Sequence, residues 1–148
     1  MPFQIANAGT AGYSAKGPNV KVLSQVVDLT DSDFSTLAST DTIEVLSVPA
    51  GTVVLSAGYE ILTAGTGTGT LSLGDGGSAA RYVAAVVQTA AGQKAALATN
   101  VPHLYTAADT IDLTSAVAVC NSKVNVWAVI CDCNNVEDNM LVTYNDNT

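Results

Sequence analysis

The sequence contains little charge, and positive charge is the scarcest. Charged residues make up 12% of the 148 residues, about half the share usual for a soluble domain, and the formal net charge is −8. Nucleic acids are bound by clustered lysine and arginine side chains, whereas the five such residues here are scattered along the chain. We therefore expect no nucleic-acid partner and no binding to anionic membranes.

Long apolar segments are also missing. No apolar run approaches the roughly 20 residues that a membrane-spanning helix needs. The first residues, MPFQIANAGTAGYSAKG, lack the basic start and apolar stretch of a secretory signal peptide. We expect synthesis in a cytoplasm without export by a signal peptide, and no membrane partner.

Cysteine and histidine are too few for a disulfide framework or a metal centre. The three cysteines, an odd number without a signal peptide, argue against structural disulfides. A closed zinc site needs four nitrogen or sulfur ligands in paired spacing. Cys131 and Cys133 with a distant Cys120 and His103 do not supply that spacing. We expect reduced thiols, no metal site and no cofactor.

Catalytic motifs are absent as well. The glycine run from Gly65 to Gly69 is followed by a predicted strand rather than by the helix that a phosphate-binding loop requires. His103 lies in the strand-like segment VPHLYT, and no nucleophile-elbow pattern accompanies it. Most of the acidic residues occupy turn positions, where local hydrogen bonding explains them. We therefore expect that the protein is not an enzyme.

The sequence instead contains segments in which apolar and small polar residues alternate. In TVVLSAGYEILTA, residues 52–64, the period of two predicts a strand with one buried face. The predicted core face consists of Val53, Leu55, Ala57, Tyr59 and Ile61. Glu60 and Leu62 fall on the opposite face, where an exposed or interfacial position is expected. Gly58 in the middle of the strand indicates a bulge or the close approach of another backbone.

Similar patterns predict strands along most of the chain. The expected strands cover residues 20–29, 41–48, 52–64, 70–73, 80–87, 103–106 and 140–144, and a hairpin takes residues 109–133. Turns are predicted at Val-Pro-Ala-Gly and at the glycine clusters, and one short helical turn is predicted after residue 29. Eight to ten short strands with turns every eight to twelve residues indicate an all-β fold. We predict a jelly-roll-like antiparallel β-sandwich.

The predicted hairpin sets a detailed register. A two-residue turn at Asn121 and Ser122 places Leu113 opposite Ile130 on an apolar face. Cys120, Trp127, Cys131 and Cys133 then fall on the other face of the hairpin.

Three segments follow from the composition. Residues 1–19 are rich in Gly, Ala, Ser and Asn with isolated apolar residues, which predicts an extended N-terminal arm. Residues 20–133 form the predicted sandwich domain. Residues 134–148 form a C-terminal tail or edge strand.

Four stretches together resemble small structural proteins of tailed bacteriophages, including capsid decoration (cement) proteins. They are VPAGTVV from Val48, TAGTGTGTLSLGDG from Thr63, YTAADTIDLT from Tyr105 and KVNVWAV from Lys123. The resemblance runs from about Ile43 to Ile130 and consists of turn and strand patterns rather than active-site residues. It implies a jelly-roll-like sandwich, often a homotrimer, that sits on the outer capsid surface of the virion, contacts the major capsid protein and stabilises the head.

Interface residues follow from that hypothesis. We expect Phe3, Ile5 and Tyr13 of the arm to contact the capsid. An oligomer interface is expected at Glu60, Leu62, Trp127 and Tyr144. The alternative is a head-fibre or spike domain that binds host-surface glycans, which predicts exposed aromatic side chains. A cellular β-sandwich enzyme or carbohydrate-binding module is a third hypothesis.

Overall fold

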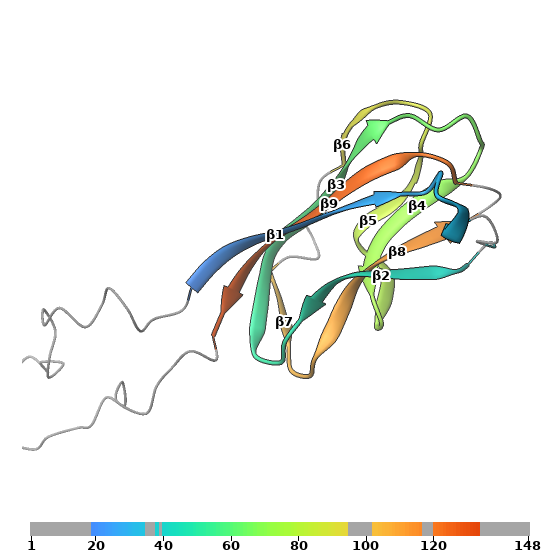
Figure 1. Cartoon of the computed structure of the whole chain (residues 1–148). Coiled ribbons are helices and arrows are strands. Elements are labelled where there is room, and N and C mark those ends of the chain that lie inside the picture. Colours follow the sequence, from blue (N-terminus) through green and yellow to red (C-terminus); the bar gives the residue numbers. More distant parts are fainter. Residues whose placement is uncertain (1–18, 35–37, 39, 95–101, 117–119, 134–148) are drawn as a thin grey trace, which may run out of the picture.

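The chain folds into an all-β sandwich in a computed structural model that describes residues 19–34, 38, 40–94, 102–116 and 120–133 (Figure 1). The described residues form nine strands and the 3-10 turn η2 (Ser32–Phe34), which lies where the helical turn was predicted. The strands are β1 (Asn19–Asp28), β2 (Thr42–Val48), β3 (Thr52–Thr63), β4 (Thr70–Asp75), β5 (Ser78–Val87), β6 (Gly92–Lys94), β7 (His103–Tyr105), β8 (Asp109–Ala116) and β9 (Lys123–Asp132). The sequence did not predict β6. The strand expected at residues 140–144 lies outside the described residues.

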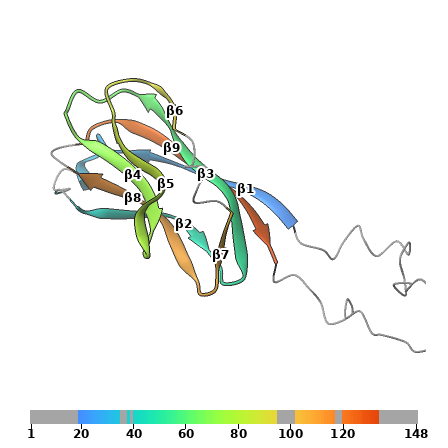
Figure 2. The same ribbon diagram turned by 180° about the vertical axis from the view of Figure 1, so that it is seen from behind.

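Two antiparallel sheets face each other. Sheet A has the strand order β1-β9-β3-β6, with β7 also paired to β3, and sheet B has the order β2-β8-β4-β5 (Figures 1 and 2). Five of the pairings are nested in the sequence, because β1 pairs with β9, β2 with β8, β3 with both β6 and β7, and β4 with β5. A long folded ribbon that rolls up into two layers produces this pattern, which is the jelly roll. The predicted fold class is therefore confirmed.

The core lies between the two sheets. Alternate residues of each long strand point inward, so sheet A contributes Tyr59 and Ile61 from β3 and sheet B contributes Leu73 from β4 and Leu113 from β8, all of them buried. The Tyr59 hydroxyl crosses the core and donates a 3.0 Å hydrogen bond to the Leu71 carbonyl of the opposite sheet. Burial of this kind stabilises a domain by about 1.5–3 kcal/mol for each large apolar side chain.

The predicted core face of β3 is correct only in its second half. Ala57, Tyr59 and Ile61 are fully buried, but Leu55 is exposed and Val54 takes the buried position instead of Val53. The pairing of β3 with β9 shifts register between Val54 and Ser56, which is a β-bulge. One extra residue in a strand moves every residue before it to the opposite face, so a strict alternation cannot hold across Leu55.

The predicted hairpin over residues 109–133 is wrong. Both strands exist, but β8 lies in sheet B and β9 lies in sheet A. Leu113 pairs with Ile43 and Leu73, while Ile130 pairs with Lys21 and Val54. In the rolled ribbon these two consecutive strands belong to opposite layers. The segment at Asn121 and Ser122 therefore crosses between the sheets instead of reversing within one.

A buried polar cluster joins the sheets near β7. The Asp75 carboxylate of sheet B accepts a 2.8 Å hydrogen bond from the Tyr105 hydroxyl of sheet A. It also accepts hydrogen bonds from the Arg81 side chain and from the backbone N–H groups of Gly77 and Ser78. Burial by itself raises the pKa of Asp75, but the hydrogen bonds from Arg81 and Tyr105 outweigh it, so the pKa lies below its ordinary value.

A second buried cluster joins the loops near the crossing segment. Gln88, which is 2% exposed, donates hydrogen bonds to the Gly69 carbonyl at 3.1 Å and to the Cys120 sulfur at 2.7 Å. Its own side-chain oxygen accepts a hydrogen bond from the Ser122 hydroxyl. These contacts explain why Cys120 is buried, whereas the hairpin register had placed it with Trp127 on the other face.

The Asp75 cluster predicts acid sensitivity. Asp75→Asn should lower the free energy of unfolding at pH 7 by roughly 2–4 kcal/mol, because it removes one partner of a buried ion pair. Since the folded-state pKa of Asp75 is lowered, its contribution is present above the ordinary value of 3.8 and is lost as the pH falls further. Urea unfolding between pH 2.5 and 7 measures both effects.

The exposed Asp33→Asn variant serves as the control and should change the free energy by less than about 0.5 kcal/mol. Equal unfolding curves for the Asp75→Asn variant and the unchanged protein at pH 7 would contradict the role of Asp75.

Candidate interaction surface

The outer face of sheet A carries apolar side chains where a solvent-facing sheet carries polar ones. One row of directly opposed residues crosses four strands, from Val20 of β1 through Cys131 and Val53 to Leu104 of β7. In the next row, Val22 lies opposite Val129. Val20, Val22 and Leu104 are 62%, 69% and 52% exposed.

These side chains gather at one end of the sheet. We call them the terminal patch, and its members are Val20, Val22, Val53, Leu104, Val129 and Cys131. The first residue of β1, Asn19, pairs with Asp132 at the end of β9, so both ends of the described chain lie beside the patch (Figure 1). Contiguous exposed apolar surface of this kind marks sites of protein–protein interaction.

The face becomes more polar away from the patch. Trp127 lies opposite Gly58, and Asn125 lies opposite Glu60 in the following row. A Cβ atom on Gly58 would lie 2.8 Å from Cζ2 of Trp127 and would also meet the Lys94 carbonyl oxygen. The predicted close approach at Gly58 is confirmed, because only glycine lets the indole ring and the β6 backbone lie against the strand. The Trp127 Nε1–H is buried and has no hydrogen-bond partner among the described residues.

The edge of sheet A is formed by β1. Ten consecutive residues of β1 pair with β9 without a register shift, and the other side of β1 pairs with no strand in the described part of the chain. By contrast, sheet B has register shifts in both of its edge pairings, and β6 and β7 are only three residues long. Long regular edges are uncommon because their free backbone groups recruit further strands.

The outer face of sheet B has the opposite character. Thr110, Asp112 and Thr114 of β8 alternate with the buried Ile111 and Leu113, and they lie beside Glu44 of β2 and Ser72 of β4. Burial raises the pKa of Asp112, and the nearby Asp109 and Glu44 charges raise it further. The outer face of sheet B is therefore polar along β8, although Val87 on the edge strand β5 is 48% exposed, whereas the outer face of sheet A is apolar over the terminal patch.

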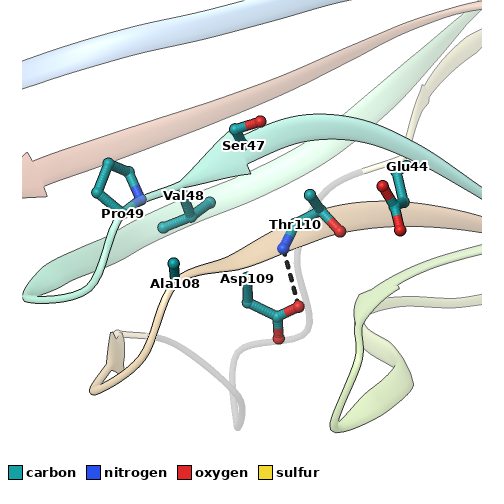
Figure 3. A pocket seen from close by; sticks show the side chains of 7 residues that line it. All are labelled: Glu44, Ser47, Val48, Pro49, Ala108, Asp109 and Thr110. Atoms are coloured by element: carbon teal, nitrogen blue, oxygen red, sulfur yellow. Dashed lines mark hydrogen bonds between the residues drawn. The ribbon is translucent and has the colours of Figure 1, made fainter.

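One shallow hollow lies between the end of β2 and the start of β8 (Figure 3). Its acidic side chains are Glu44 and Asp109, and Asp109 accepts a hydrogen bond from the Thr110 backbone N–H at 2.8 Å. The described residues contain no group of three or more His, Cys, Asp or Glu side chains arranged to hold a metal ion. The hollow therefore resembles neither a metal centre nor an enclosed ligand cavity.

His103 does not form a catalytic triad in the described residues. Its Nε2 atom lies 3.9 Å from Oδ2 of Asp75, and its ring packs edge-on against Tyr105 with centroids 4.8 Å apart. The Asp75 carboxylate is already bound to Arg81 and Tyr105, and no described hydroxyl or thiol hydrogen bonds to His103. Nucleophilic catalysis requires a nucleophile within hydrogen-bond reach of the base, and the described residues place none beside His103.

None of the three cysteines forms a disulfide. Cys120 is buried, Cys133 is exposed, and the sulfur atoms of Cys131 and Cys133 lie 4.0 Å apart. None of the helices in the described ranges is long and apolar enough to cross a membrane.

The structure brings three of the sequence-predicted interface residues onto one face. Glu60, Leu62 and Trp127 lie on the outer side of sheet A, and Leu62 is 44% exposed. Phe3, Ile5, Tyr13 and Tyr144 lie outside the described residues. Sequence reasoning missed the terminal patch itself. The alternating valines of β1 were the available signal, but their exposure became evident only when the strand order placed β1 at an edge.

Comparison with known proteins yields matches among solved structures alone, since no family model and no curated protein matches the sequence. A chain in the capsid asymmetric unit of cyanophage Pam1 is 26% identical with a TM-score of 0.59, over 88% of this chain and 99% of that chain. A chain in the capsid of Ralstonia phage GP4 is 16% identical with a TM-score of 0.56, over 79% and 86%. A chain in the acidic stable capsid of Helicobacter pylori bacteriophage KHP30 is 10% identical with a TM-score of 0.57, over 76% and 86%.

The close packing at Gly58 gives a testable prediction. Gly58→Ala should lower the free energy of unfolding by about 1–3 kcal/mol, because the added methyl group must displace Trp127 or the β6 backbone. Trp127 is the only tryptophan, so its fluorescence spectrum reports the displacement directly. The control is Ser56→Ala on the same strand, which adds no atom. An unchanged spectrum and unchanged stability in Gly58→Ala would contradict the contact.

Proposed function

We propose that the chain is a structural protein of a bacteriophage virion that binds the outer capsid surface as an oligomer and stabilises the head. The observation that carries the proposal is the apolar terminal patch on a fold similar to that of chains in three phage capsid structures. A protein that worked alone in solution would gain nothing from this exposed apolar row, whereas a partner surface would bury it.

The major capsid protein is the proposed partner of the terminal patch. Stable interfaces bury about 1,200–2,000 Å² in total and place apolar side chains at their centre. The patch supplies such a centre, and the arm that contains Phe3, Ile5 and Tyr13 joins the sandwich directly beside it at Asn19. We propose that these three residues contact the capsid as well. The polar side chains along β8 on the outer face of sheet B suit the solvent side of a protein on the outside of a shell.

We propose self-association through the part of the same face that lies away from the terminal patch, toward the end of β3. Trp127 and Glu60 lie in neighbouring rows there, and Leu62 follows near the end of β3, where it is 44% exposed. We propose a homotrimer, with Tyr144 as a further contact. The net charge of −8 keeps such a protein from binding nucleic acid. The chain needs no cofactor and catalyses no reaction in this role.

Glycan binding finds no specific support. Sugar recognition by stacking needs exposed aromatic rings, but Tyr59, Tyr82 and Tyr105 are buried in the core. In the described part of the chain, the remaining aromatic side chains are Phe34 and Trp127, and both are partly buried. We therefore favour capsid binding over a fibre or spike domain.

Binding to heads tests the proposal. The purified protein should co-sediment with phage heads that lack it, and Leu104→Asp should weaken this binding by at least about tenfold, because a charge would enter the buried centre of the interface. Ala84→Asp, at an exposed position on β5 of the other sheet, is the matched control and should bind normally. Failure of the unchanged protein to bind heads would contradict the proposed function. Full binding by Leu104→Asp would contradict the role of the patch.

The oligomeric state gives a separate prediction. Light scattering after size-exclusion chromatography at tens of micromolar should give the mass of three chains. Trp127→Ala should shift the equilibrium toward the monomer, because it removes the largest side chain of the proposed interface. A monomer both in solution and on isolated heads would be incompatible with the homotrimer.

A further inference from the structure

We infer that the free edge of β1 binds the N-terminal arm of a neighbouring copy as an additional strand of sheet A. This inference deepens the proposed function and rests on it, since it specifies how the head-binding oligomer is held together. Its starting point is the edge itself, which lacks the features that normally prevent strand addition.

The edge of β1 is long, regular and apolar. Ten residues run without a bulge, and Val20, Val22 and Val26 alternate on one side with exposures of 62%, 69% and 45%. β1 contains no proline, and Lys21 is the only lysine on it. Short strands, bulges, prolines and several lysines are the usual protections of a sheet edge, so β1 is open to pairing with another strand. A local contact of Gln25 with the Val26 carbonyl, at 3.2 Å, is the kind of bond that an added strand would replace.

The N-terminal arm has the composition of a strand that fits this edge. Lys16 is the only charged residue among residues 1–18, and Phe3 and Ile5 are two positions apart. In an extended chain these two side chains point to the same face. On the edge of β1 they would continue the apolar outer face of sheet A beside the valines. The enlarged face would still be available to the capsid, so the arm can serve both contacts.

Length and attachment favour a neighbouring copy as the donor. Eighteen extended residues span up to about 60 Å, whereas the ten residues of β1 span about 33 Å. The arm joins β1 at Asn19 through Gly17 and Pro18, and the residue before a proline prefers an extended conformation. An extended junction would lead the arm onward along the axis of β1 rather than back over its own edge, which favours the edge of another chain. Strand addition of this kind gains main-chain hydrogen bonds and side-chain contacts together.

A complementation experiment tests the exchange with full-length chains. The first variant, Phe3→Lys with Ile5→Lys, has a disabled arm and an intact edge. The second variant, Val22→Lys with Val26→Lys, has a disabled edge and an intact arm. Each alone should be monomeric by light scattering, and an equimolar mixture should give a complex with the mass of one chain of each kind. Lysine in both variants ensures that a disabled arm and a disabled edge repel each other.

Controls separate the exchange from other effects. Gln4→Lys with Ala6→Lys puts the same charge on the opposite side of the arm and should leave the oligomer of the unchanged protein intact. Far-ultraviolet circular dichroism checks that each variant is folded, and Val22→Thr with Val26→Thr replaces the lysine edge variant if that one is unfolded.

Several outcomes would overturn the inference. A mixture that stays monomeric would show that the arm binds its own edge or none at all. An oligomer that survives in the arm variant but not in the edge variant would indicate direct pairing between two β1 strands. An unchanged protein that is monomeric both in solution and on isolated heads would show that no arm passes between copies. If the mixture fails while the unchanged protein still binds heads, the exchange is wrong and the proposed function stands.

Discussion

Sheet A carries apolar side chains on both of its faces, so one apolar face stays in contact with water unless a partner covers it. The inner face is covered by sheet B, with Tyr59 and Ile61 packed in the core. The outer face has no such cover in the described residues, and its most apolar rows contain Val20, Val22 and Leu104. Removing that surface from water is favourable by about 25 cal/mol per Å², so a partner that covers the face gains binding free energy from it.

The sandwich holds this face in place through two buried polar clusters. The Asp75 cluster links sheet B to β7, and β7 carries Leu104 at the patch. The Gln88 cluster fixes the crossing segment at Cys120 and Ser122, from which β9 starts. Buried hydrogen bonds need specific geometry, so they define the relative positions of the sheets more sharply than apolar contacts do. The rows of the outer face therefore present a fixed surface, which lowers the entropic cost of binding.

Local patterns in the sequence predicted most of the strands and the fold class, because alternation and turn residues act over short distances. The errors arose where long-range pairing decided the outcome. The bulge at Leu55 reverses the faces of β3, and no local signal marks it. The prediction of a hairpin at Asn121 was wrong because the local sequence does not distinguish two cases. A polar pair between two apolar strands is compatible with a reversal within one sheet and also with a crossing between two sheets. Glu60, Leu62 and Trp127 lie on one face, but their role in an oligomer interface stays a prediction. The exposure of Val20 and Val22 depends on the strand order, which no local pattern specifies. Whether the chain divides into an arm, a domain and a tail as the composition suggests stays a prediction.

The central claim is that the outer face of sheet A becomes buried in the assembled particle. Amide hydrogen exchange compared between the isolated protein and the head-bound protein tests it most directly, because exchange reports each strand separately. The account predicts slower exchange on heads at the edge strand β1 and around Leu104, with no change at the outer residues of β8 such as Thr110 and Thr114. Protection of sheet B with β1 unchanged would contradict it.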